Sequence, residues 1–150
     1  MNKLTISLGS IAENWKTLNS KATSGAVVKA NGYGLGAASI AQKLLNSGCK
    51  NFFVATIEEG IELRKTIKND NIYIFHGAQQ NEIAEFEKHK LIPVLNNAEQ
   101  LAIWPKDKPA AAQFDTGMTR LGFAPETSVH NTELAKPGIT PLLLSKWFCT

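Results

Sequence analysis

The sequence lacks the features that mark several large classes of protein. It holds only two cysteines, Cys49 and Cys149, without C-x-x-C spacing. Both are therefore expected to be free thiols in a reducing compartment rather than parts of a disulfide scaffold. No apolar run approaches the roughly 18 residues of a membrane helix. The N-terminus also lacks the apolar core of a signal peptide. We therefore expect a cytoplasmic protein that does not enter a membrane.

The sequence also lacks a large excess of either basic or acidic side chains. The chain carries 16 basic and 13 acidic side chains, a net charge of +3. No basic run interleaved with aromatic residues appears, so nucleic acid is not an expected partner. The three histidines, His76, His89 and His130, lack the spacing of metal ligands, and no metal site is expected. Repeats, low-complexity segments and linkers are absent, so residues 1–150 are interpreted as one domain.

What the sequence does contain is an alternation of short apolar runs with longer stretches of helical spacing. Strands are predicted at 26–30, 52–55, 72–75, 91–95, 110–114 and 140–145. Helices are predicted at 10–20, 58–68 and 97–104, around Ile40 and Leu44, and around Ile83 and Phe86. This order predicts βαβ units and a parallel sheet, closed either as an open doubly wound sheet or as a (β/α)8 barrel. A whole barrel takes roughly 250 residues, so this chain would supply about six of the eight units.

Lys29 is the residue that points most directly to chemistry. It ends an apolar strand, and in a barrel the carboxyl ends of the strands form the catalytic mouth. A lysine in apolar surroundings has a lowered pKa and can attack an aldehyde as the neutral amine, as a pyridoxal-phosphate Schiff base requires. The alternative is a surface lysine that extends its ammonium into water. Gly32, Gly34 and Gly36 give G-x-G-x-G, a weak indication of a nucleotide-binding loop.

Two blocks of sequence resemble alanine racemases, a family of pyridoxal-phosphate enzymes with a TIM barrel. The first, at residues 27–37, reads VVKANGYGLGA and resembles the family's cofactor-attachment signature. The resemblance implies that Lys29 forms the Schiff base and that Tyr33 contacts the cofactor phosphate. Leu35 stands where the family usually has a histidine.

The second block, at residues 114–123, reads FDTGMTRLGF and resembles the segment whose arginine faces the active site. The resemblance implies that Arg120 lies near the cofactor hydroxyl and binds the substrate carboxylate, for which its planar fork is suited. Alone, Arg120 could equally form a surface ion pair. Weaker similarities at residues 6–15 and 54–60 extend the resemblance over nearly the whole chain.

The resemblance implies racemisation of alanine between its L and D forms, which feeds peptidoglycan synthesis, in a homodimer. It also exposes departures. Gln113 replaces a lysine that is often carbamylated and orients the arginine, and Lys146 replaces a histidine. The last barrel strands and a C-terminal β domain are missing, together with the tyrosine that serves as second acid/base in the partner's active site. Two other interpretations therefore stay open, a non-enzymatic pyridoxal-phosphate binder and a truncated remnant.

Overall fold

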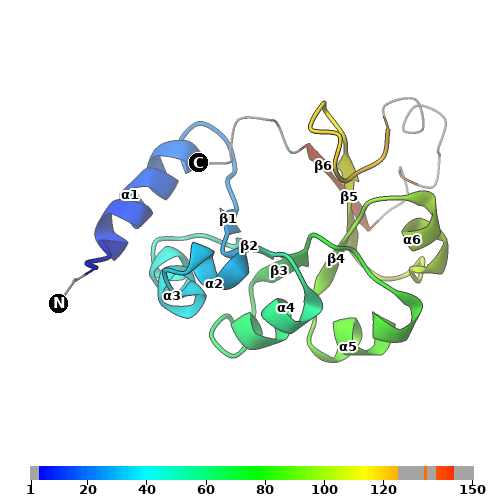
Figure 1. Ribbon diagram of the computed structural model, residues 1–150, viewed down its shortest axis with the longest axis horizontal. Helices are drawn as coiled ribbons and strands as arrows, with labels where there is room; N and C mark the ends of the chain where they lie inside the picture. Colours follow the sequence, from blue (N-terminus) through cyan, green and yellow to red (C-terminus); the bar gives the residue numbers. More distant parts are fainter. Residues whose placement is uncertain (1–3, 125–133, 135–137, 144–150) are drawn as a thin grey trace. The chain divides into compact units, whose positions relative to one another are not determined.

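The computed structural model describes residues 4–124, 134 and 138–143. The chain divides into two compact units, Met1–Tyr73 and Ile74–Thr150, and each is described by itself. Strands and helices alternate along both units, as Figure 1 shows by colour.

The first unit contains three parallel-type strands and the helices that follow them. Its elements are α1 (Leu8–Asn19), β1 (Ala26–Val27), α2 (Lys29–Tyr33), α3 (Ala37–Asn46), β2 (Asn51–Val54), α4 (Ile57–Arg64) and β3 (Asn71–Ile74). β1 pairs with β2 in parallel, with Ala26 opposite Phe52, and β3 follows β2 in the sheet. The rings of Phe53 and Tyr73 stack with 4.7 Å between their centroids.

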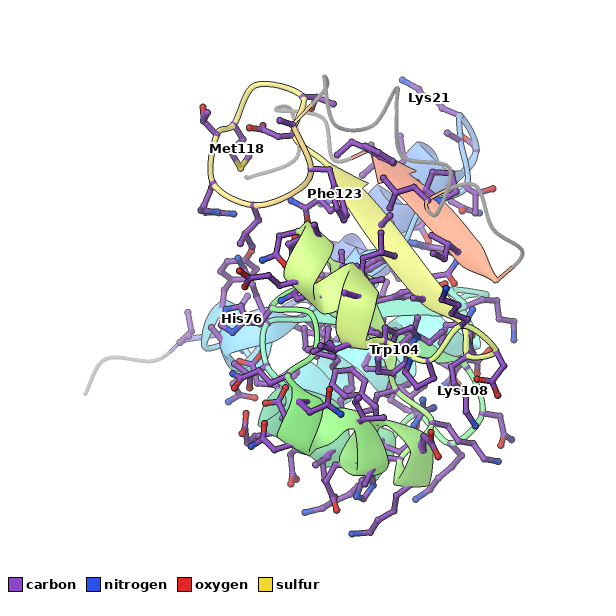
Figure 2. The ribbon with its side chains drawn as sticks, turned by 90° about the vertical axis from the view of Figure 1, so that its right-hand side faces the viewer. Lys21, His76, Trp104, Lys108, Met118 and Phe123 are labelled. Carbon is purple, nitrogen blue, oxygen red and sulfur yellow. The ribbon has the colours of Figure 1, made fainter. Side chains whose placement is uncertain are left out.

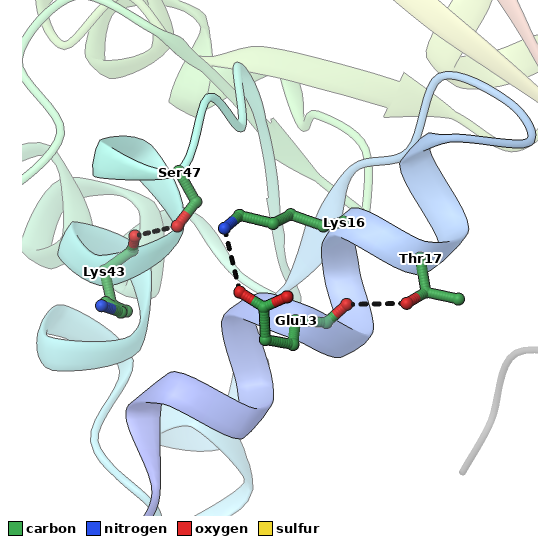
Figure 3. Close-up of polar contacts among 5 residues, drawn as sticks. All are labelled: Glu13, Lys16, Thr17, Lys43 and Ser47. Atoms are coloured by element: carbon green, nitrogen blue, oxygen red, sulfur yellow. Dashed lines mark hydrogen bonds and ion pairs between the residues drawn. The ribbon is translucent and has the colours of Figure 1, made fainter.

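Helix α1 begins at a side-chain cap and lies beside α3. Ser7 caps it by accepting a hydrogen bond from the Ser10 N–H, and its buried Trp15 donates from Nε1 to the Ser24 carbonyl at 3.1 Å. The polar contacts of both helices are shown in Figure 3, including the ion pair between Lys16 and Glu13 at 2.9 Å. Both charged side chains are exposed, so this pair adds little stability; the apolar contact of Trp15 and Ala12 with the interior fixes the helix.

A half-buried arginine, Arg64, closes the connection from α4 to β3. The Arg64 guanidinium donates from Nη1 to the carbonyls of Ile67 at 3.0 Å and Asp70 at 2.8 Å. Burial lowers the pKa of Arg64 from its ordinary value, against the opposing effect of Asp70. The carbonyls of this turn therefore receive their hydrogen bonds from one side chain rather than from the N–H groups of a further helical turn.

The second unit repeats the strand-and-helix pattern. Its elements are η1 (Gln80–Glu82), α5 (Ile83–Lys88), β4 (Ile92–Leu95), α6 (Ala98–Ile103), β5 (Ala110–Phe114) and β6 (Ile139–Leu143). All pairings are parallel, β4 with β5 and β5 with β6. Phe86 meets Trp104 edge to face at 5.4 Å. Trp104, labelled in Figure 2, donates from Nε1 to the Lys108 carbonyl at 3.3 Å, which satisfies its buried N–H.

Each of the six predicted strands is found, the fifth with its predicted ends and the others with shifted ends. The first stops at Val27 instead of continuing to residue 30, and the last begins at Ile139 and is described only as far as Leu143. The helix predicted at 58–68 ends at Arg64. Among the described residues, no helix is long and apolar enough to cross a membrane. In the same part of the chain, Cys49 is a buried free thiol and no cluster of ligand residues could hold a metal ion.

Candidate active site

Lys29 directly follows the point at which β1 leaves the sheet. The buried Val28 still donates its N–H to the Phe53 carbonyl at 2.9 Å, and pairing ends there. Lys29 is half-buried. Its Nζ forms no ion pair or hydrogen bond with any residue of the described part, and it lies 5.9 Å from the centroid of the Tyr33 ring. The prediction that Lys29 stands at the carboxyl end of a parallel strand is correct.

The backbone after Lys29 is left-handed over consecutive residues. The φ angles are 50° at Ala30, 52° at Asn31, 64° at Gly32 and 55° at Tyr33, so α2 is a left-handed turn. The Gly32 N–H donates to the Val28 carbonyl and the Gly34 N–H to that of Ala30. Each L-residue other than glycine pays roughly 1–2 kcal/mol for this conformation. Such a turn persists only where surrounding contacts hold it.

Contacts with α3 hold the far end of this turn. The Asn31 side chain accepts a hydrogen bond from the Ala37 N–H at 2.9 Å, at the first residue of α3. Gly32 is buried against the same helix, and a Cβ there would lie 3.0 Å from Cδ1 of Ile40 and 3.2 Å from the Ala37 nitrogen. Gly32 is therefore required both because the turn approaches α3 closely at this point and because its φ is positive.

Glu59 holds the near end of the turn. Its Oε1 accepts from the Ala30 N–H and its Oε2 from the Ala55 N–H, both at 2.7 Å. Ala55 directly follows β2, so one carboxylate links the carboxyl ends of two neighbouring strands. The sequence interpretation missed Glu59. The pattern Thr56-x-x-Glu59 indicates a capping box, and Thr56 does cap α4, but the pattern does not reveal that Glu59 reaches Ala30.

Arg120 lies in the second unit, on a loop that follows β5. The loop closes on itself, because Phe123 donates its N–H to the Gln113 carbonyl at 2.8 Å and Asp115 donates its N–H to Phe123 at 2.9 Å. Asp115 Oδ1 accepts from the N–H groups of Thr119 and Gly117. These bonds lower the pKa of the Asp115 carboxyl, Thr119 contributing most. Met118, labelled in Figure 2, lies on the same loop, and Arg120 is exposed.

Gln113 is buried under this loop and is 8% exposed. Its Nε2 donates to the Leu121 carbonyl at 3.1 Å, one residue beyond Arg120. The amide that departs from the racemase pattern thus fastens the loop that carries the arginine. Gln113 Oε1 and Asn96 Oδ1 are the buried side-chain oxygens of the described residues that have no hydrogen-bond partner. The register of Leu95 with Ala112 sets these two amides opposite each other on adjacent strands.

The structure thus brings Lys29 and Tyr33 together, with Tyr33 60% exposed beside the lysine. Arg120 belongs to the other unit, so its closeness to Lys29 stays a prediction. Lys146 and Cys149 lie outside the described residues. A lysine amine that is partly accessible and free of ion pairs fits an aldehyde cofactor such as pyridoxal phosphate, because nothing must be displaced before it can react. Tyr33 would then be the neighbouring hydroxyl donor for such a group.

Comparisons with known proteins indicate the family to which this sequence is similar. The sequence model of a family described as alanine racemase, N-terminal domain, matches residues 6–150. Over 131 residues the chain is 44% identical to the alanine racemase of Rickettsia prowazekii, covering 80% of this chain and 32% of the relative. The alanine racemase of Rhizobium meliloti is 38% identical over 137 residues, or 85% of this chain and 36% of the relative.

A solved structure shares the fold. The alanine racemase of Bartonella henselae, described with covalently bound pyridoxal phosphate, matches with a TM-score of 0.80 at 33% identity, over 94% of this chain and 46% of that one. The barrel prediction is therefore confirmed over the doubly wound alternative, and six strands fit an incomplete barrel. The chain spans about a third of the length of these curated relatives and under half of that solved chain.

Proposed function

Since the chain belongs to the alanine racemase family, we propose that it serves the pyridoxal-phosphate-dependent racemisation of alanine, with Lys29 as the residue that binds the cofactor aldehyde. The observation that carries the proposal is the placement of a lysine amine that pairs with no described residue at the carboxyl end of β1, on a turn that is fixed at both ends. When bound, the cofactor withdraws electrons from the substrate's α-carbon and so makes its proton removable.

Each candidate residue then has a distinct task. Lys29 would hold the cofactor through Nζ and would take or return a proton at the substrate's α-carbon on one face. Tyr33, beside the Lys29 amine, is proposed to donate its hydroxyl to the cofactor phosphate. Arg120 is proposed to hold the substrate carboxylate with its guanidinium fork, at the end of a loop fastened by Asp115 and Gln113.

Racemisation also needs a group on the opposite face of the α-carbon, because the proton leaves from one side and returns on the other. The resemblance implies that a tyrosine of a partner subunit's C-terminal β domain supplies it, in a homodimer. This chain spans about a third of the length of its curated relatives, so the activity of the whole protein is a proposal. The second candidate function is cofactor binding without turnover. We propose that the complete site makes D-alanine in the cytoplasm. This D-alanine would be used in peptidoglycan synthesis.

The test is reductive labelling of the purified chain. Mixing with pyridoxal phosphate, reduction with borohydride and peptide mapping by mass spectrometry are expected to place one label on Lys29. Lys29→Ala should abolish that label, whereas Lys43→Ala, which removes an exposed lysine of α3, should leave it unchanged. A label scattered over surface lysines in the parent chain would refute the proposal. Exchange of the α-proton of D- and L-alanine in heavy water then separates catalysis from binding alone, since a mere binder exchanges neither.

A further inference from the structure

The carboxylate of Glu59 has two partners, and both are backbone N–H groups at the carboxyl ends of strands. It accepts from Ala30, next to Lys29, and from Ala55, next to β2, each at 2.7 Å. From these contacts we propose that Glu59 is a positioning residue, which fixes the turn beside the Lys29 amine by fixing the peptide that follows Lys29. This inference rests on the proposed cofactor role of Lys29.

A carboxylate suits this position because both partners are donors. At the end of a parallel strand a backbone N–H loses its partner in the sheet and must find another acceptor. Glu59 offers two equivalent oxygens and a negative charge, which shortens and strengthens such bonds. A glutamine could offer only one acceptor oxygen, and its NH2 group would then face a backbone N–H, donor against donor. Replacement by glutamine therefore removes one of the two bonds while keeping the volume of the side chain.

The link to Lys29 is the peptide between Lys29 and Ala30. Its N–H is held by Glu59, and Ala30 has a φ of 50°. If that peptide rotates toward the conformation that alanine prefers, the turn that follows Lys29 moves relative to β1, and with it Tyr33, whose ring centroid lies 5.9 Å from Lys29 Nζ. Asn31 holds the other end of the turn through Ala37 but lies beyond the peptide in question. Glu59 is thus the contact that keeps the start of the turn, and so Tyr33, in place beside the Lys29 amine.

The bond from Ala55 is part-buried and the bond from Ala30 is exposed. Glu59 and Ala55 are half-buried, and Gly60 and Ile57 of α4 are buried. The helix that carries Glu59 is itself capped by Thr56, which accepts from the Glu59 N–H at 3.4 Å. The backbone of Glu59 is therefore fixed at the start of α4, and from there its carboxylate reaches the turn.

The experiment compares the parent chain with Glu59→Gln and with Glu62→Gln as matched control. Glu62 lies on the same helix, but its carboxylate is exposed and pairs only with Lys65. Two quantities are measured under conditions where circular dichroism shows all three proteins folded. The first is the hydrogen exchange of the Ala30 and Ala55 amides. The second is the rate at which Lys29 is labelled by pyridoxal phosphate and borohydride.

In Glu59→Gln, exchange at Ala30 or Ala55 is expected to quicken by about ten- to a hundredfold, the effect of losing one hydrogen bond to a charged group. Labelling of Lys29 is expected to slow by about tenfold or more, because Tyr33, the proposed donor to the cofactor phosphate, is no longer held beside the amine. Glu62→Gln should change neither quantity. Equal labelling rates in all three proteins, with Lys29 labelled normally, would overturn the inference. If Lys29 is labelled in none of them, the proposed function fails, and the amide exchange alone then shows whether Glu59 holds the turn.

Discussion

Gly122→Ala tests whether the Arg120 loop is closed by a contact that leaves no room for a side chain. Gly122 has a φ of +106°, and an added Cβ would lie 2.9 Å from the Asp115 nitrogen and 2.9 Å from the Gln113 carbonyl oxygen. Both atoms are main-chain atoms that bond to Phe123 and close the loop. Neither can move away without lengthening one of those bonds, so the substitution should open the loop.

The expected loss of stability has two parts. A positive φ costs an alanine roughly 1–2 kcal/mol relative to glycine. Losing the two closing hydrogen bonds adds about 1–3 kcal/mol at about 0.5–1.5 kcal/mol each. Gly117→Ala is the matched control, because Gly117 has a similar φ of +114° but nothing lies within 4 Å of its added Cβ. It should therefore lose only the first part.

The assay is urea unfolding followed by tryptophan fluorescence, to which the buried Trp104 of the same unit contributes. We expect the free energy of unfolding to fall about 1–3 kcal/mol further in Gly122→Ala than in Gly117→Ala. Equal losses in the two variants would show that backbone strain alone accounts for Gly122. The closing contact with Gln113 and Asp115 would then have no energetic role.

Three further outcomes follow from single contacts. The N–H groups of Thr119 and Gly117 lower the pKa of the Asp115 carboxyl. Asp115 should therefore stabilise the fold at pH values above the ordinary aspartate pKa of about 3.9, and this effect should be lost as the pH falls through the lowered pKa of the folded state. The difference in urea midpoint between the parent and Asp115→Asn should accordingly disappear in acid. Arg64→Met should lower the free energy of unfolding by about 1–3 kcal/mol, since the carbonyls of Ile67 and Asp70 lose their donor, whereas Lys65→Met on the surface should not. Cys49, whose pKa is raised by burial, should react with iodoacetamide far more slowly in the folded chain than in urea, as peptide mapping would show; equal rates would contradict its burial.

The strands could be predicted from sequence because they coincide with short, largely apolar runs, and such runs differ from the amphipathic helices between them. The end of β1 could not. Residues 26–30 are apolar apart from Lys29, so the pattern extends the strand to Ala30, but the chain turns left-handed at that residue. Asn31 and the glycines tolerate that conformation. Ala30 and Tyr33 do not favour it, and only contacts from other segments impose it.

Both segments that carry the proposed site residues are built in the same way, which explains what the sequence could and could not show. Each follows a parallel strand, contains L-residues at positive φ such as Ala30 and Thr119, and is held by polar side chains bonded to main-chain groups. In the second loop Asp115 is close in sequence to the groups it binds, so the motif already contains its own support. In the first, Glu59 stands 29 residues from Ala30. A motif can therefore identify Lys29. Glu59, the residue that holds the turn after Lys29, is found only once the fold has brought the two strand ends together.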